Sequence, residues 1–236
     1  MIRILAESQW RYIVKYSFII PTKNEARYLK GCIDSIRAQS VSDWEMVVVD
    51  SYSTDGTEDI AREGGAKVLY EKRKGPGIAR NTGAWKSRGN TLIFADADVR
   101  FTEDFLEKLG DVKGGCIFDV RFWDAGALHN LIFDAWNVSI RILMRLGIYV
   151  TNGSCMALEK SVFKKVRGFR PDLLTNEDHD MAIKTSRIAP FVFAPLRVYT
   201  SARRLRSAGV ANYIRMHYQN TRNYALRGES NNDYWE

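Results

Sequence analysis

Two aspartates separated by a single residue are the first chemical signal in this chain. Asp96 and Asp98 follow Thr91–Phe94, four residues that suit a buried strand. Residues two apart on an extended backbone point the same way, so both carboxylates can meet just beyond the strand end. That edge is where ligands bind in open α/β sheets. Carboxylates this close repel each other unless a divalent cation joins them. The pattern indicates a metal site, and the alternative is a solvated acidic loop.

Other polar groups occur where a parallel sheet would bring them to the same edge. Pro21–Glu25 and Asp50 follow the first two predicted strands, and Arg80–Asn81 lies on the third predicted helix. A second acidic cluster, Glu177–Asp178, comes from the later half of the chain, with capping of a helix N-terminus as its alternative role. Together these groups indicate a nucleotide-type crevice along the carboxyl edge of a sheet.

Alternating strands and helices must position these groups. Apolar runs that end in polar residues predict strands at Ser17–Ile20, Glu45–Val49, Ala66–Tyr70 and Thr91–Phe94. Helices are expected between them at Ala26–Ala38, after Thr57 as far as Glu63, and at Ile78–Ser87. Pro21 is expected to close the first strand, and the spacing from Thr22 to Glu25 is typical of a capping box. We therefore predict an α/β fold, with a mostly parallel central sheet flanked by helices.

Beyond Phe101 the strand–helix alternation becomes less regular. Strands are expected at Gly114–Arg121, running antiparallel, at Thr151–Leu158, and at Phe191–Ala194 between Pro190 and Pro195. Helices are expected at Thr102–Leu109, from Ala127 towards residue 150, at Glu159–Val166, and from Thr175 to about Arg187. The helix from Ala127 should be amphipathic, with one apolar face formed by Leu128, Leu131, Ile132, Ala135, Ile142 and Leu146.

Bulk properties narrow the class of protein. A length of 236 residues with 45% apolar residues suits one α/β domain or two small ones. The three cysteines, Cys32, Cys116 and Cys155, are widely spaced, so we expect buried thiols in a reducing compartment and no structural zinc. Charges interrupt every apolar run in residues 1–12, which predicts neither a signal peptide nor a membrane anchor.

The positive charge of the chain is concentrated in its C-terminal stretch. Between residues 197 and 228 there are seven arginines, no lysine and no acidic residue. Removing these seven from the 35 basic residues leaves 28, which equals the number of acidic residues. The net charge of +7 therefore resides in this segment, which suits phosphate, a lipid headgroup or nucleic acid.

Six motifs, in order and with typical gaps, resemble the inverting family 2 glycosyltransferases of GT-A fold. They are I-I-P-T-K-N-E from Ile19, V-V-V-D-S-Y-S-T-D-G-T from Val47, G-I-A-R-N-T-G from Gly77, D-A-D from Asp96, N-G-S-C-M-A-L-E-K-S-V-F from Asn152 with Gly168–Phe169 after it, and N-E-D-H-D from Asn176. The resemblance covers roughly residues 17–187. It implies a Rossmann-like nucleotide-diphospho-sugar transferase fold, with residues 16–110 as the nucleotide-sugar half, 111–202 as the acceptor half, and 203–236 as a basic helical segment of the same domain.

The resemblance also implies roles for individual residues. Asp98, with Asp96, would bind Mn²⁺ or Mg²⁺, and His217 is a further candidate ligand. Asp178, or secondarily Glu177, would be the general base that deprotonates the acceptor hydroxyl. The residues expected to bind the nucleotide sugar are Pro21, Thr22, Asn24, Glu25, Asp50, Ser53, Arg80, Asp96, Ala97, Arg203 and Arg204.

These roles describe a metal-dependent inverting transferase that moves a sugar to a hydroxyl of a glycan or lipid-linked saccharide. One alternative is a polyprenyl-phosphate glycosyltransferase, whose phosphate acceptor needs no strong base. A sugar nucleotidyltransferase is a weaker alternative, because its G-x-G-x-R loop is replaced here by P-T-K-N-E. A nucleic-acid-binding module would explain the arginines but would leave the carboxylates without a role.

The expected partners are a nucleotide-diphosphate sugar, a glycan or lipid-linked acceptor and an anionic membrane surface, with a homodimer as a further candidate and no nucleic acid. We expect a cytoplasmic protein, peripheral at the inner face of the cell membrane. The sequence leaves open which nucleotide, sugar and acceptor are used.

Overall fold

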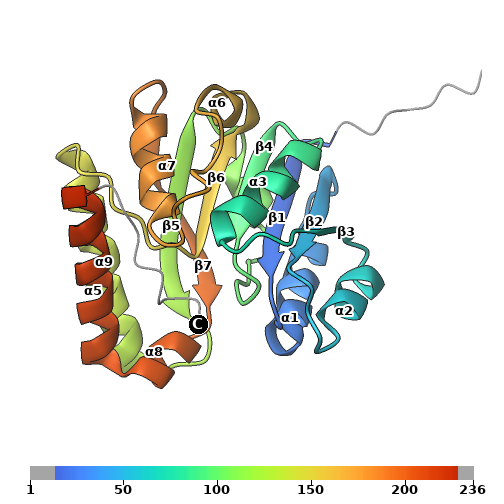
Figure 1. The fold of residues 1–236 in the computed structure, drawn as a ribbon, viewed down its shortest axis with the longest axis horizontal. Coiled ribbons are helices and arrows are strands. Elements are labelled where there is room, and N and C mark those ends of the chain that lie inside the picture. Colours follow the sequence, from blue (N-terminus) through green and yellow to red (C-terminus); the bar gives the residue numbers. More distant parts are fainter. Residues whose placement is uncertain (1–13, 228–236) are drawn as a thin grey trace, which may run out of the picture.

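The computed structural model describes residues 14–227, in which seven strands form one mixed sheet (Figure 1). The leader for which no signal peptide or anchor is expected, residues 1–12, lies outside this range. The strands are β1 (Tyr16–Thr22), β2 (Trp44–Asp50), β3 (Lys67–Tyr70), β4 (Thr91–Ala95), β5 (Gly115–Phe122), β6 (Cys155–Glu159) and β7 (Phe191–Thr200). Their order across the sheet is β3-β2-β1-β4-β6-β5-β7.

Helices cover both faces of this sheet. They are α1 (Ala26–Arg37), α2 (Thr57–Glu63), α3 (Pro76–Lys86), α4 (Phe105–Leu109), α5 (Ala127–Arg145), α6 (Lys160–Lys165), α7 (Glu177–Ser186), α8 (Arg203–Ala208) and α9 (Val210–Arg227). Alternate residues of β1 and β4 enter two separate cores, one shared with α1 and α4 and the other with α3, α6 and α7. This two-sided burial explains why these strands are continuous apolar runs.

The predicted α/β fold is confirmed, and its parallel half lies where the sequence indicated. β3, β2, β1 and β4 are parallel neighbours, and Thr22 pairs with Asp50 at the ends of β1 and β2. The polar residues that follow these strands therefore emerge at one edge of the sheet. The first strand passes through Pro21, rather than ending at it. This is tolerated because the pairing of β1 with β4 stops at Ile19, so no neighbour on that side needs the missing N–H.

The second half of the sheet joins the first through antiparallel pairing. β6 is antiparallel to both β4 and β5, so it is the reversed strand of the sheet. β5, the strand expected to run antiparallel, points in the same direction as β4, and that prediction is wrong. β7 runs parallel to β5 and extends to Thr200, so the prediction that Pro195 would end it is wrong. The pairing register shifts between Ile117 and Asp119, opposite Pro195, and β7 is an edge strand. Edge strands and bulges are the two places where a sheet accepts proline.

The capping box predicted for the first helix does not form. Thr22 belongs to β1, and its hydroxyl donates to the Asp50 carboxylate at 2.9 Å instead of capping α1. The N–H groups at the start of α1 are bound by the loop after β2 and by the first residue of α2. Ala26 N–H donates to the Asp55 carboxylate at 3.0 Å, and Glu25 N–H donates to the Thr57 hydroxyl at 2.8 Å. The loops after β1 and β2 therefore stabilise each other.

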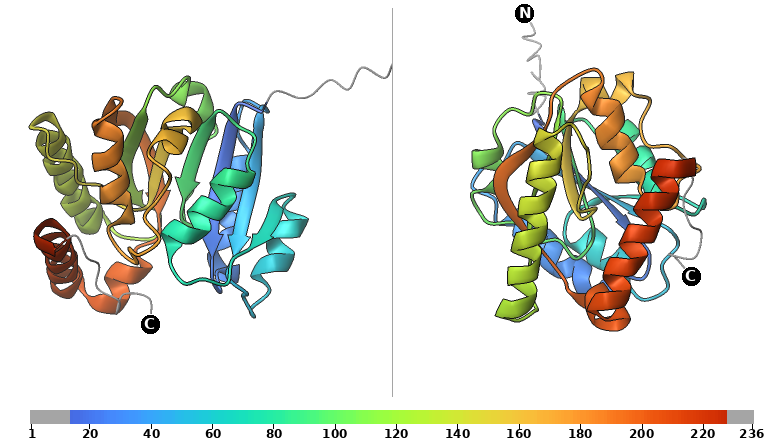
Figure 2. Two further views of the ribbon diagram at one scale, coloured as in Figure 1. Left: turned by 45° about the horizontal axis from the view of Figure 1, so that its top comes forward. Right: turned by 90° about the vertical axis from the view of Figure 1, so that its left-hand side faces the viewer.

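Helices α5 and α9 lie at the end of the molecule away from β3 (Figures 1 and 2). β6 pairs with β5 only as far as Ile117, and side chains of α5 take over beyond that point. The Asn137 amide bonds both backbone groups of Val120, and Asn130 accepts from Phe122 N–H at 2.8 Å. Within the described range, no helix is long and apolar enough to cross a membrane.

Candidate active site

Asp50 is the centre of a hydrogen-bonded network at the ends of β1 and β2. It is buried, and its carboxylate accepts from the Thr22 hydroxyl at 2.9 Å, the Ser53 hydroxyl at 2.6 Å and Ser53 N–H at 2.8 Å. Asn24 joins the network, since its N–H donates to Ser53 at 2.8 Å and its side-chain oxygen accepts from Thr54 at 2.9 Å. Four predicted nucleotide-binding residues, Thr22, Asn24, Asp50 and Ser53, thus form one rigid cluster.

Arg80 links the two acidic motifs across the molecule. Its guanidinium donates to Asp96 at 2.8 Å and to Glu177 at 2.5 Å, and it is buried against the ring of Phe169. Arg80 lies on α3, Asp96 follows β4, and Glu177 begins α7, so one side chain ties three elements together. A guanidinium suits this place because it can bind two carboxylates in a fixed geometry.

A second arginine binds the other aspartate of the D-A-D motif. Arg203, at the start of α8, forms two hydrogen bonds to Glu25, at 2.6 and 2.8 Å, and lies over the ring of Tyr28. Its Nε lies 2.9 Å from Asp98 as an ion pair, although the N–H is not aligned for a hydrogen bond. The opposite side of the Asp98 carboxylate accepts from the Thr200 hydroxyl at 3.1 Å. The C-terminal region therefore contacts the metal-site candidate directly.

Burial changes the acidity of the carboxylates. Burial, reinforced by the charge of Asp96 and opposed by Arg203, raises the pKa of Asp98 to about 6. Burial likewise raises the pKa of Glu177 to about 7, even though Arg80 beside it favours the ionised form. The charges of Asp178 and Asp96 add to the effect of burial on Glu177, because all three acids share one guanidinium. Perturbed carboxylates gathered in one place are typical of functional sites.

Asp178 is held in the ionised form by its immediate partners. Burial raises its pKa, but the charge of His179 and hydrogen bonds from His179 and Thr151 outweigh burial and hold the pKa well below the usual range. His179 Nδ1 lies 3.1 Å from the Asp178 carboxylate, and the Thr151 hydroxyl donates to the other carboxylate oxygen. Gly153 lies beside that oxygen, where a Cβ would be 3.4 Å away. Asp178 is therefore a charged hydrogen-bond acceptor at neutral pH.

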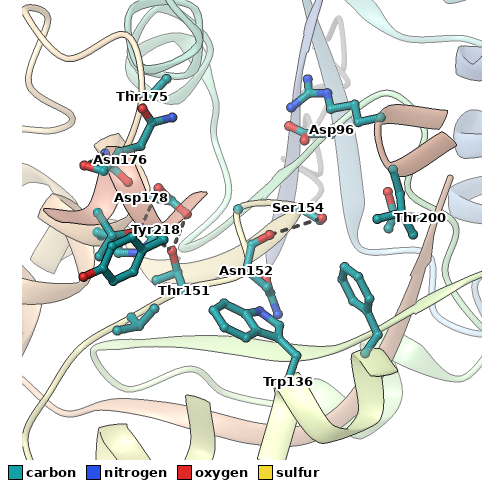
Figure 3. A pocket seen from close by; sticks show the side chains of 18 of the residues that line it. Asp96, Trp136, Thr151, Asn152, Ser154, Thr175, Asn176, Asp178, Thr200 and Tyr218 are labelled. Carbon is teal, nitrogen blue, oxygen red and sulfur yellow. Dashed lines mark hydrogen bonds and ion pairs between the residues drawn. The ribbon is translucent and has the colours of Figure 1, made fainter. Parts of the chain in front are cut away.

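A cavity of about 610 Å³ brings these groups to one surface. Asp98 is among the residues that line it. Asp96 lies on one side, and Asp178 and Thr151 lie on another, with Asn152 between them (Figure 3). The wall formed by α5 is largely apolar, and Trp136 projects from it into the same space (Figure 3). The cavity is thus polar near the carboxylates and apolar along α5, as ligand sites commonly are.

Besides Arg80 Nε, two buried polar atoms of this cavity lining have no hydrogen-bond partner among the described residues. They are the side-chain oxygen of Asn152 and the hydroxyl of Thr175. A buried polar group left without a partner costs about 1–3 kcal/mol. Both atoms are therefore candidates to bond a ligand hydroxyl.

The remaining residues predicted to bind the nucleotide sugar or the metal do not all line the cavity. Ala97 lies in the hydrophobic core, so only its backbone is available to a ligand. Arg204 lines the cavity, whereas Arg203 is held by Glu25 and Asp98. The His217 side chain lies outside the described residues.

Sequence reasoning missed Thr151, Thr200 and Trp136, which all line the cavity. Thr151 precedes the Asn152–Gly153 turn, a position that could have signalled it, but Thr200 is 102 residues from Asp98 and gives no local signal.

The donor set at Asp96 and Asp98 fits a divalent cation that is shared with a substrate. Among the described residues, no group of three or more histidine, cysteine, aspartate or glutamate side chains could hold a metal alone. Mg²⁺ and similar ions are usually bound by one or two carboxylates together with substrate phosphates. The guanidinium of Arg203 lies against Asp98, which shows that this carboxylate accepts a cationic partner. Asp96 and Asp98 would hold the ion, and a diphosphate would complete its shell.

Comparison with known proteins gives a consistent result. The Glycosyl transferase family 2 sequence profile matches residues 17–112. Glycosyltransferase GlyA of Streptococcus pneumoniae is 36% identical over 100 residues, which are 40% of this chain and 14% of that protein. The chain spans less than half the length of the curated relatives it matches.

Solved structures match nearly the whole chain. Mannosyltransferase PcManGT from Pyrobaculum calidifontis, in complex with GDP-Man and Mn²⁺, superposes with a TM-score of 0.67 at 23% identity, over 87% of this chain and 64% of that one. S. aureus TarS 1-349 with UDP-GlcNAc gives a TM-score of 0.65 at 21% identity, over 79% and 58%. Residues 17–112 are therefore similar to glycosyl transferase family 2, and the chain as a whole shares the fold of the GT-A glycosyltransferases.

Proposed function

We propose that this protein is a metal-dependent inverting glycosyltransferase that moves a sugar from a nucleotide-diphosphate sugar to a hydroxyl of a glycan or lipid-linked saccharide. One observation carries the proposal. The carboxylates suited to a metal and diphosphate, Asp96 and Asp98, line the same cavity as the ionised Asp178. Figure 3 shows Asp96 and Asp178 around this cavity. The family match supports it, as does the fold shared with structures that contain GDP-Man with Mn²⁺ or UDP-GlcNAc.

The donor half would comprise residues 16–110. The cluster around Asp50 would bind the base and ribose, with the Asp50 carboxylate accepting a hydrogen bond from the base. Arg80 would lie near the diphosphate, and Arg203 and Arg204 would clamp it from the C-terminal segment. Mn²⁺ or Mg²⁺, held by Asp98 and Asp96, would neutralise the charge that develops on the leaving nucleoside diphosphate. Residues 111–202 would supply the acceptor half, and residues 203–236 would complete the domain.

Asp178 would act as the general base. As the acceptor hydroxyl attacks the anomeric carbon, its proton passes to the Asp178 carboxylate, the new glycosidic bond forms, and the bond to the diphosphate oxygen breaks on the opposite face. Attack from that opposite face inverts the anomeric centre. Thr151 and His179 hold Asp178 ionised and oriented for this step. Glu177 binds Arg80, so we assign it to positioning rather than to proton transfer.

A polyprenyl-phosphate acceptor is the second candidate, and the apolar wall of the cavity favours it. A phosphate acceptor is already ionised, so it would not need the base that Asp178 provides. The ionised, cavity-facing Asp178 therefore supports a hydroxyl acceptor. Peripheral attachment at the cytoplasmic face of a membrane is part of the proposal. It is supported by the exposed apolar residues of α5 and by the C-terminal arginines.

Paired aspartate variants on α7 test the catalytic assignment. UDP-glucose, UDP-N-acetylglucosamine and GDP-mannose would be supplied with Mn²⁺ and a panel of glycoside acceptors, and release of the nucleoside diphosphate measured. We expect Asp178→Asn to lower turnover by about 10²- to 10⁴-fold, the usual contribution of a general base, with nucleotide binding unchanged.

Asp180→Asn is the matched control for this experiment. Asp180 is as buried as Asp178 and lies on the same helix. Its carboxylate binds Lys184 and Tyr224, and it does not line the cavity. The control should keep turnover within about tenfold of the wild type. Full turnover in Asp178→Asn, or an equal loss in both variants, would refute the assignment of Asp178 as base.

A further inference from the structure

Helix α5 buries polar side chains together with Ile140 and Met144, and it exposes most of its other apolar side chains to solvent. The residues that bond β5 are Asn130, Asp134, Asn137 and Arg141. The residues on the opposite side are exposed, with Leu128, Leu131 and Leu146 at 68%, 66% and 71%. An ordinary surface helix buries its apolar stripe. The outer face of α5 therefore resembles the surface of a helix that contacts an apolar partner.

This apolar surface continues into the cavity that contains the catalytic carboxylates. Ile132, Trp136 and Leu143 occupy the side of α5 that lines the cavity, next to the exposed face around Leu128 and Leu131. In Figure 3, Trp136, Asn152 and Thr151 are drawn around the same pocket. Leu174 and Leu205 add apolar lining from other elements. One continuous surface thus leads from the outside of α5 to Asp178.

We propose that the cavity takes an amphiphilic acceptor, a sugar joined to a long apolar chain. The sugar lies at the polar end, with its reacting hydroxyl at Asp178 and further hydroxyls within reach of Asn152 and Thr175. The apolar chain runs past Trp136 and Ile132 and leaves over the exposed face of α5. This assignment rests on the proposed function and names the acceptor class of that same site.

The chemistry of the cavity wall favours an amphiphilic acceptor over a purely carbohydrate acceptor or a second copy of the chain. A purely carbohydrate acceptor needs hydrogen-bond partners along its length, but His129 and Ser139 are the polar side chains that α5 contributes to the described lining. A second copy of the chain would cover the outer face of α5 without accounting for its continuation to Asp178. Exposed arginines on α5 and α9, Arg145, Arg215 and Arg222, also suit the anionic surface in which such chains are embedded.

An alkyl glycoside series tests the proposal. Methyl, hexyl and octyl β-glucoside, each below its micelle concentration, would be titrated into the full chain by calorimetry with Mn²⁺ and UDP or GDP present. We expect affinity to rise by up to about fourfold for each methylene that is buried. Octyl glucoside binding should fall at least about tenfold in Trp136→Ala, while methyl glucoside binding changes by less than about threefold.

Trp85→Ala is the matched control. Trp85 on α3 is 49% exposed, close to the 43% of Trp136, but it does not line the cavity. Its replacement should leave binding of octyl glucoside unchanged. Equal affinity for methyl and octyl glucoside overturns the proposal, and so does an equal loss in both tryptophan variants. Concentration-dependent dimerisation that is abolished by Leu131→Glu, without dependence on chain length, would instead assign this face to a second copy.

The same titrations separate this proposal from the proposed function. Metal-dependent nucleotide binding without any dependence on alkyl length would refute only the amphiphilic acceptor. Failure of both UDP and GDP to bind would refute the donor site, while the alkyl series would still decide what the α5 wall binds.

Discussion

Arg203 competes for the carboxylate on which the proposed metal site depends. Its guanidinium is held by Glu25 and by the ring of Tyr28, and it lies 2.9 Å from the Asp98 carboxylate. Two cations this close to one carboxylate repel each other strongly in a partly buried site. A metal at Asp98 is therefore accommodated best when a diphosphate is also present, because its negative charge then attracts both cations.

Replacing Arg203 should have opposite effects on the metal and on the nucleotide. In Arg203→Ala, we expect Mn²⁺ alone to bind at least about tenfold more tightly, because the competing charge is removed. Binding of the nucleoside diphosphate with Mn²⁺ should weaken about tenfold or more, because a charged contact to phosphate is lost. Calorimetry of Mn²⁺ and of the nucleotide measures both effects. The control is Arg222→Ala, at an exposed arginine on α9, which should change neither affinity. A change of both affinities in the same direction in Arg203→Ala would refute the role given to Arg203.

Local motifs indicated most of the polar site, but not how its members bind one another. Asp50 ends a strand, and Asp96 and Asp98 follow one, so the alternation of elements was enough to place them at one edge. The link from Arg80 to Glu177 spans 97 residues, and the link from Arg203 to Glu25 spans 178. Such contacts depend on the packing of α3, α7 and α8, which periodicity and turn patterns do not determine.

At the scale of elements, Asp124 in the loop after β5 binds α8 and the two residues before it. Asp124 accepts from the Ser201 hydroxyl at 2.6 Å, from Ala202 N–H at 2.7 Å, and from Arg206 at 2.7 Å. Burial raises the pKa of Asp124, but these three donors outweigh it and lower the pKa to about 2. A carboxyl whose pKa is lower in the folded state adds stability above its unfolded pKa, and this stability is lost as pH falls through the folded value.

Asp124→Asn should therefore destabilise the protein at neutral pH but not in strong acid. We expect a loss of about 2 kcal/mol at pH 7, which shrinks as pH falls from about 4 towards 2, because the wild-type carboxylate is itself protonated there. Thermal unfolding of both proteins across this range measures the difference. Asp34→Asn on the exposed side of α1 should change stability by less than about 0.5 kcal/mol. A deficit that stays constant down to pH 2 would contradict the role of Asp124.

Three elements show where sequence patterns reached their limit. The apolar positions of α5 correctly predicted an amphipathic helix, but not that Asn130 and Asn137 would bind β5 and leave the leucines exposed. Backbone hydrogen bonding at the free edge of β5 decided the orientation of the helix. The Thr22–Glu25 spacing suggested a capping box, yet the buried Asp50 competes for the Thr22 hydroxyl. Pro195 was expected to end a strand, but an edge strand tolerates it.

For the molecule as a whole, charge and apolar surface occur in the same region. The C-terminal arginines and the exposed face of α5 belong to neighbouring elements at one end of the protein (Figure 2). We expect the protein to bind vesicles that contain anionic lipid at low salt, and to dissociate as salt screens the arginines. Co-sedimentation with vesicles of neutral lipid alone should show weaker binding.

Two substitutions at exposed apolar positions identify the surface that contacts the vesicles. Leu131→Glu on α5 should reduce binding, because it places a negative charge against an anionic surface. Ile188→Glu, at a similarly exposed isoleucine after α7, should not. Absence of vesicle binding at low salt would refute the proposed membrane attachment, but it would leave the proposed donor site untouched.

The most direct test of the central claim is calorimetric titration of UDP and GDP, each with Mn²⁺ and with chelator, into the wild type and Asp98→Asn. The account predicts that one nucleotide binds only with Mn²⁺, that Asp98→Asn abolishes this binding, and that Asp104→Asn, at an exposed aspartate in the loop before α4, retains it. Binding that persists with chelator or in Asp98→Asn, or the failure of both nucleotides to bind, would contradict the proposal of a metal-dependent nucleotide-sugar site.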